Sequence, residues 1–92
     1  MSTALHEHSV IDPQFGHVVN HDFASYHITA NADVGSIDVH FVDEEDEHGN
    51  PMKSKGIGEL GVVGTAAAIA NAVHHATGVR VRDLPITLDK LL

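Results

Sequence analysis

The segment between Gly64 and Gly78 constrains the fold most, because it combines helical periodicity with a glycine at each end. Apolar residues recur there at three- and four-residue steps, which places them on one stripe of a helix. Gly78 stands where a left-handed residue ends a helix. We therefore predict a helix from Gly64 or Thr65 to Thr77, with a neighbouring backbone packed closely at Ala72. The predicted stripe consists of Val62, Ala66, Ile69, Val73 and Ala76.

A second signal is the alternation of apolar and polar residues over positions 36–42. Ile37, Val39 and Phe41 would lie on one face of a β-strand, because side chains alternate between faces at every residue. The strand should end at Asp43–Glu47, a run of acidic residues that repel one another and favour a solvated loop.

Weaker signals fill in the rest of the chain. Residues 1–8 have helical character, Asp12–Gly16 has the proline and glycine of a turn, and Thr87 can cap a short helix over Leu88–Leu92. These elements predict the α+β class: a small mixed domain with a few strands, one alanine-rich helix and a short C-terminal helix. We expect a single domain spanning residues 1–92.

Composition excludes several functions. Thirteen acidic residues against five basic ones give a net charge of −8, which disfavours binding to nucleic acid. The chain has no cysteine and so cannot hold an iron–sulfur cluster or a disulfide. No apolar run approaches the length of a membrane span, and the first residues do not resemble a signal peptide, so we expect a cytoplasmic protein.

Nine histidines suggest a metal site, but their spacing argues against one. His6 and His8, or the adjacent His74 and His75, do not share one helical face, and the i, i+4 pair typical of helical metal sites is absent. We expect surface histidines and no metal ligands. The only two arginines, Arg80 and Arg82, are expected to pair with Asp83 or with the acidic run, and an anion site is the alternative.

The best candidate for chemistry is the run Lys55-Gly56-Ile57-Gly58-Glu59. Two glycines around one residue allow a sharp turn that brings bare backbone N–H groups close to a ligand. A carboxylate directly after the turn would then lie at a fixed place beside that ligand. By itself such a string is usually a plain turn with a solvated glutamate.

Its context adds a family resemblance. The runs Lys55–Glu59, Ala67–Val73 and Ala76–Thr87 closely resemble the carboxy-terminal end of the large, molybdopterin-binding subunit of the xanthine dehydrogenase and aldehyde oxidoreductase family, the molybdenum hydroxylases. Weaker likeness extends over all of residues 1–92. Lys53-Ser54 stand where that family usually has a Gly-Ala pair.

The resemblance implies that Glu59 is the catalytic base in the oxidation of an aldehyde or N-heterocycle, and that Gly56, Ile57 and Gly58 lie against a molybdenum–pterin cofactor. It implies as partners the remainder of the large subunit and the iron–sulfur and flavin subunits. We expect the chain alone to be inactive, to bind no cofactor and to form homo-oligomers. The alternatives are a non-catalytic fragment that folds as a small self-associating interaction domain, and a histidine-rich metal-binding module.

Overall fold

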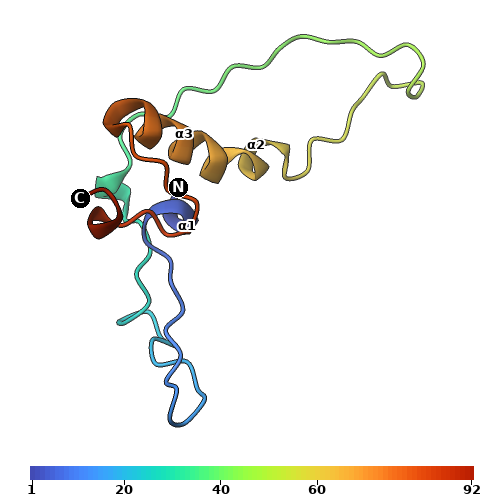
Figure 1. The fold of residues 1–92 in the computed structure, drawn as a ribbon. Helices are drawn as coiled ribbons and strands as arrows, with labels where there is room; N and C mark the ends of the chain where they lie inside the picture. The colour runs from blue at the N-terminus through green and yellow to red at the C-terminus, as the bar shows by residue number, and fades with distance from the viewer.

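The computed structural model describes residues 1–92 and contains five short helical elements joined by long irregular segments (Figure 1). A helical body lies at the centre, and two arms extend from it in different directions. We define the short arm as residues 8–28 and the long arm as residues 34–59. In chain order the elements are α1 (Ser2–Leu5), the 3-10 helix η1 (Asn31–Asp33), α2 (Leu60–Val63), α3 (Thr65–Thr77) and the 3-10 helix η2 (Leu88–Lys90).

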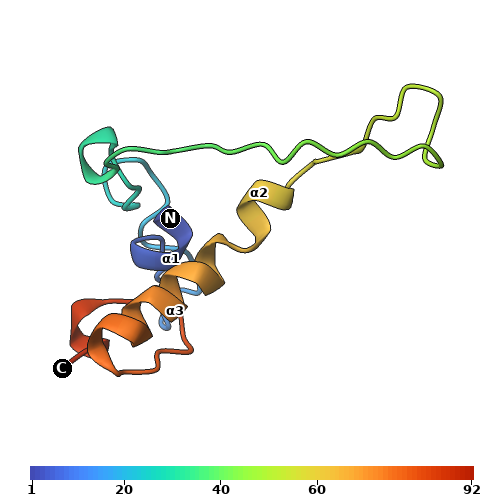
Figure 2. The same cartoon turned by 90° about the horizontal axis from the view of Figure 1, so that it is seen from above.

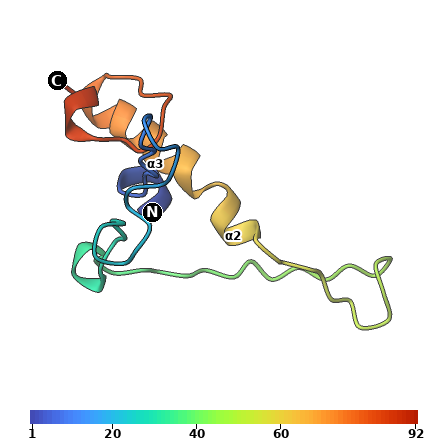
Figure 3. The same cartoon turned by 90° about the horizontal axis from the view of Figure 1, so that it is seen from below.

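The body forms where α1 packs against α3 and the chain after α3 wraps back over α1 (Figures 2 and 3). Ala4 is completely buried and Ile86 is 5% exposed. The Ile86 N–H donates to the Ala4 carbonyl oxygen at 2.7 Å and ties the C-terminal segment to α1. Only three of the 92 residues are buried, so the core is very small.

Helix α3 has the bounds that the sequence predicts. Gly78 has a φ of 78° and its N–H donates to the His74 carbonyl oxygen at 2.8 Å, which ends the helix in a left-handed residue. The expected buried stripe forms only in part: Ala66, Ile69 and Val73 are half-buried, whereas Val62 and Ala76 are exposed. Ala72 is exposed as well. The expected close packing at Ala72 is therefore wrong, because α1 contacts α3 without covering Ala72.

The short arm is held by side-chain hydrogen bonds and by two backbone bonds, from the Asp12 N–H to His17 and from the Val19 N–H to Val10. Asp12 accepts the N–H groups of Gln14 and Phe15, which makes the predicted turn. Asn20 bridges the two limbs by accepting from the Val10 N–H at 2.9 Å and donating to the His8 carbonyl oxygen at 2.6 Å.

The Tyr26 hydroxyl fastens the short arm to the body by donating to Glu7 at 3.1 Å. Partial burial, the hydrogen bond to Glu7 and the charge of Glu7 all raise the pKa of Tyr26 above its ordinary value. Nearby, hydrogen bonds from Ser25 lower the pKa of Asp22, and the same bonds stabilise the turn at residues 22–26 within the arm.

The long arm is extended but forms no sheet. The sole β-pairing in the structure is an isolated antiparallel bridge between Ile11 and Val18 in the short arm. The predicted α+β class is therefore wrong: the chain is mostly irregular, with a helical stretch that runs from α2 into α3. Residues 36–42 have the alternation of a strand, but a strand also needs a hydrogen-bonded neighbour, and none lies beside them.

The shape of the chain is far from that of a compact protein. Its radius of gyration is 18.4 Å, against about 12 Å for a compact domain of this length. Its accessible surface is 7868 Å², against about 5,200 Å² for a compact monomer of this mass. The difference, about 2,700 Å² on this chain alone, exceeds the roughly 800 Å² that one partner buries in an interface of standard size. None of the helices is both long and apolar enough to cross a bilayer.

Candidate functional site

The candidate loop Lys55–Glu59 forms the last part of the long arm and leads into α2 (Figure 1). Gly58 has a φ of 46°, a conformation that favours glycine, and the Leu60 N–H donates to the Ile57 carbonyl oxygen at 2.9 Å to close the turn. The backbone N–H groups of Gly56, Ile57 and Gly58 donate to no protein acceptor. A Cβ added at Gly56 or Gly58 would meet nothing within 4 Å, so the loop presents bare, unpaired donors.

Glu59 follows this turn and is the N-cap residue of α2. Its carbonyl oxygen accepts from the N–H groups of Val62 and Val63, which fixes its backbone at the start of the helix. Its side chain makes no capping bond, no ion pair and no other hydrogen bond, and the residue is exposed. The structure thus leaves the predicted base free for another role.

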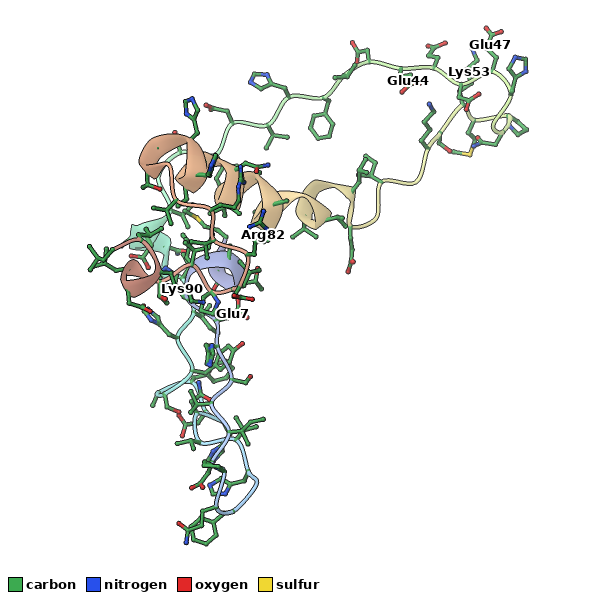
Figure 4. All side chains as sticks on the ribbon, in the orientation of Figure 1. Glu7, Glu44, Glu47, Lys53, Arg82 and Lys90 are labelled. Atoms are coloured by element: carbon green, nitrogen blue, oxygen red, sulfur yellow. The ribbon has the colours of Figure 1, made fainter.

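Ion pairs hold the two limbs of the long arm together near its tip (Figure 4). Lys55 lies 2.7 Å from Glu44, and Lys53 lies 2.9 Å from Glu45 and 3.9 Å from Glu47. Pairing of the acidic run with arginine was therefore the wrong expectation. The sequence does contain a signal for these lysine pairs, because Lys53 and Lys55 follow the five acidic residues directly after a Gly-Asn-Pro turn.

Lys53 is also the single non-glycine residue with positive φ, at 54°. A left-handed conformation costs a residue with a Cβ roughly 1–2 kcal/mol. A glycine at this place would adopt the same conformation without that cost. The ion pairs to Glu45 and Glu47 draw the Lys53 side chain towards the acidic run and away from the candidate loop.

The first part of the candidate loop, Lys55 to Ile57, lines an open depression of 480 Å³, whereas Gly58 and Glu59 are not among its lining residues. One side consists of Gly56, Ile57 and Leu60. The other consists of His40, Phe41 and Val42, which belong to the part of the long arm before the acidic run, here called the outgoing limb. A glycine turn with free N–H donors fits against an anionic cofactor, but these residues supply one wall and no enclosure. A larger depression, of 640 Å³, lies on the short arm around Phe23 and Tyr26 and contains none of the predicted site residues.

The histidine candidates do not assemble into a site. No group of three or more metal-ligating side chains comes together, although the rings of His6 and His27 stack with centroids 4.6 Å apart. Arg80 donates to the Asn71 side chain at 2.8 Å and makes no ion pair, so the expected pairing of the arginines with Asp83 or the acidic run is wrong.

Comparison with known proteins gives relatives along the whole chain, although no family model matches it. The chain is 54% identical over all 92 residues to the aldehyde oxidoreductase molybdenum-binding subunit PaoC of Escherichia coli, of which it covers 13%. It is 36% identical over 88 residues to the putative xanthine dehydrogenase molybdenum-binding subunit XdhA of Escherichia coli, of which it covers 12%. It is 39% identical over 74 residues to a nicotinate dehydrogenase subunit of Pseudomonas putida, of which it covers 6%.

These relatives are subunits of oxidoreductases, and two of them are named as molybdenum-binding. The chain therefore belongs to the xanthine dehydrogenase and aldehyde oxidoreductase family, and it matches a short segment of that family's molybdenum-binding subunits. The family predicted from the glycine turn and the alanine-rich helix is confirmed.

Proposed function

We propose that this chain supplies the catalytic loop of a molybdenum-dependent hydroxylase, with Glu59 as general base and Gly56, Ile57 and Gly58 against the pterin cofactor. The observation that supports this most strongly is the 54% identity, over all 92 residues, to a molybdenum-binding subunit, together with an unpaired Glu59 directly after a turn with three unpaired N–H donors. A carboxylate that stabilised the fold would be paired or would cap α2. When bound, the cofactor would supply the redox chemistry, which the cysteine-free chain has no groups to perform.

Within the proposed site the residues of this chain have distinct tasks. The backbone N–H groups of Gly56, Ile57 and Gly58 would bind acceptor atoms of the cofactor. Glu59 would take up a proton at a carboxylate oxygen, and the start of α2 would hold its backbone in place. Lys55, neutralised by Glu44, would keep the loop beside the outgoing limb.

The chain alone cannot complete this site, since the depression beside the loop is open and Glu59 is exposed to water. We propose the remainder of a large subunit as the direct partner and iron–sulfur and flavin subunits as further partners. The substrate class would be an aldehyde or an N-heterocycle, and the isolated chain would be inactive. A cytoplasmic location stays a prediction.

The test is a chimera in which residues 1–92 replace the matching segment of the Escherichia coli aldehyde oxidoreductase subunit. The chimera should oxidise aldehydes. Glu59→Gln should lower kcat by roughly 100-fold or more, because the amide keeps the shape of the side chain but cannot accept the proton. Asp43→Asn is the matched control, since Asp43 is another exposed carboxylate of the long arm without an ion pair. Equal turnover by the Glu59→Gln and Asp43→Asn chimeras would refute the catalytic role.

A second function, a small self-associating domain without catalysis, is favoured by the exposed apolar side chains of the arms. Phe23 is 93% exposed and Phe41 is 80% exposed. Such a chain should form dimers or larger oligomers in light scattering at high micromolar concentration. A chimera without activity together with a stable oligomer of defined size would favour this second function over the first.

A further inference from the structure

Three of the five basic residues of the chain line one open depression of 470 Å³ on the body, where Figure 4 labels two of them. The lining consists of Arg80, Val81, Arg82, Asp83 and Lys90. None of these three cations makes an ion pair, because every ion pair in the structure belongs to Lys53 and Lys55 of the long arm. Unpaired cations thus gather at one place on a chain whose net charge is −8.

The cationic side chains have donors left for a ligand. Arg80 donates one hydrogen bond, to the Asn71 side chain at 2.8 Å, and the Arg82 side chain donates none. A guanidinium group has five N–H donors, so both arginines retain most of theirs. The Lys90 Nζ donates to two backbone carbonyl oxygens, at 3.0 and 2.8 Å, which fixes the ammonium group and leaves one of its three donors free.

The charges that line the depression match a phosphate monoester. Three cations and the Asp83 carboxylate give a net charge of +2, and a phosphate monoester carries about −1.5 to −2 at neutral pH. Its three acceptor oxygens can bind all three cationic groups at once, whereas a carboxylate has a single charge and two oxygens. The planar fork of arginine also fits phosphate oxygens. The volume lies in the range of roughly 300–1,000 Å³ that is typical of small-molecule sites.

We propose that Arg80, Arg82 and Lys90 bind the phosphate group of a small phosphate ester. Asp83 would accept a hydrogen bond from a hydroxyl group in the organic part of that ester. This site is separate from the candidate loop, since the two depressions share no lining residue. The inference therefore does not rest on the proposed function.

The charge elsewhere on the chain favours a small ligand over a large polyanion. The acidic run Asp43–Glu47 lies at the far end of the long arm, away from the body (Figures 1 and 4). Its field is screened over about 8 Å at physiological ionic strength, so it does not oppose a small anion at the body. A polyanion would extend over other acidic parts of the surface and be repelled by them.

NMR titration of the 92-residue chain, first with inorganic phosphate and then with glycerol phosphate, tests the site. Resonances of residues 80–83 and of Lys90 should shift along a saturable curve, whereas sodium chloride at equal ionic strength should not produce it. Arg82→Gln should weaken the binding of both ligands roughly 10-fold, because charge-assisted hydrogen bonds are lost. The Arg82 side chain is exposed, so the resonances of α3 should stay in place in this variant.

The matched control is Lys53→Gln, which removes the same charge from the long arm and should leave both affinities unchanged. Equal affinities of the Arg82→Gln and Lys53→Gln variants, or the absence of a saturable shift, would overturn the inference. Tighter binding of a glutamate-rich peptide than of glycerol phosphate would also overturn it, in favour of an acidic protein partner. Tighter binding of glycerol phosphate than of inorganic phosphate supports the ester, and the reverse order would replace the ester with free phosphate.

Discussion

The helical body and the long arm differ in where their structure comes from. Helix α3 has its own periodicity, its own left-handed end at Gly78 and a neighbour in α1, all within this chain. The long arm has local features too, namely an alternating pattern and ion pairs near its tip, but residues 35–42 make no backbone hydrogen bond within the chain. A helix satisfies its backbone groups locally, whereas a strand needs a second strand.

This difference fits the distribution of the proposed site. The residues assigned to chemistry, from Gly56 to Glu59, lie where the arm returns to the body. The start of α2 fixes the backbone of Glu59 from one side, while the opposite wall consists of arm residues that need a partner themselves. Under the proposed function, the start of α2 would hold the backbone of Glu59 in place, and the rest of a subunit would close the site.

The largest expected contrast between the regions comes from truncating one isoleucine in each. Ile86→Ala should destabilise the body by about 2–5 kcal/mol, because Ile86 is 5% exposed against α1. Ile37→Ala in the isolated chain should change stability by less than about 0.5 kcal/mol, because its side chain is 75% exposed. Thermal melts followed by circular dichroism at 222 nm, which report on α3, measure both. Similar melts for the two variants would remove the distinction between the body and the long arm.

A smaller contrast separates two alanines within the body. Ala4→Leu should cost about 1–3 kcal/mol by overpacking, since Ala4 is fully buried beneath α3. Ala72→Leu should change stability by less than about 0.5 kcal/mol, because Ala72 is exposed. The same melts provide the measurement. A larger cost at Ala72 than at Ala4 would show that the face of α3 that packs on the body is assigned wrongly.

Local sequence signals predicted the correct elements, whereas signals that depend on distant residues did not. The bounds of α3, the turn at Asp12 and a short helical turn after Thr87 were all predicted, because each is determined by neighbouring residues. Thr87 does not make the expected side-chain cap. The exposure of Ala72 and the missing partner of residues 36–42 depend on chain segments far away in sequence or outside this chain.

The sequence predicted the turn of the candidate loop but not the ion pair that holds the loop beside the acidic run. Gly56, Ile57, Gly58 and Glu59 do form an open turn with a free carboxylate, as two glycines before a glutamate suggested. The pairing of Lys55 with Glu44 was missed, because a run of like charges predicts solvation and does not reveal which cation the chain returns to it. The catalytic role of the loop remains a proposal.

The smallest expected effect concerns the link between the short arm and the body. The single tyrosine, Tyr26, should ionise above its ordinary pKa of 10.0, because burial and Glu7 oppose the phenolate. A raised pKa means that the folded state retains the proton, so this stabilisation is present below pH 10.0 and is lost as pH rises through the folded value. Absorbance at 295 nm follows the titration directly. Glu7→Gln should lower the midpoint, and an unchanged midpoint would show that Glu7 does not act on Tyr26.

Amide hydrogen exchange of the isolated chain, at a dilution where it is monomeric, tests most directly whether the long arm lacks a partner within this chain. The helical hydrogen bonds of α3 should protect its amides, while residues 35–42 should exchange at the rate of an unstructured peptide. Strong protection of residues 37–42 in the monomer would contradict this, because the chain would then contain its own partner strand.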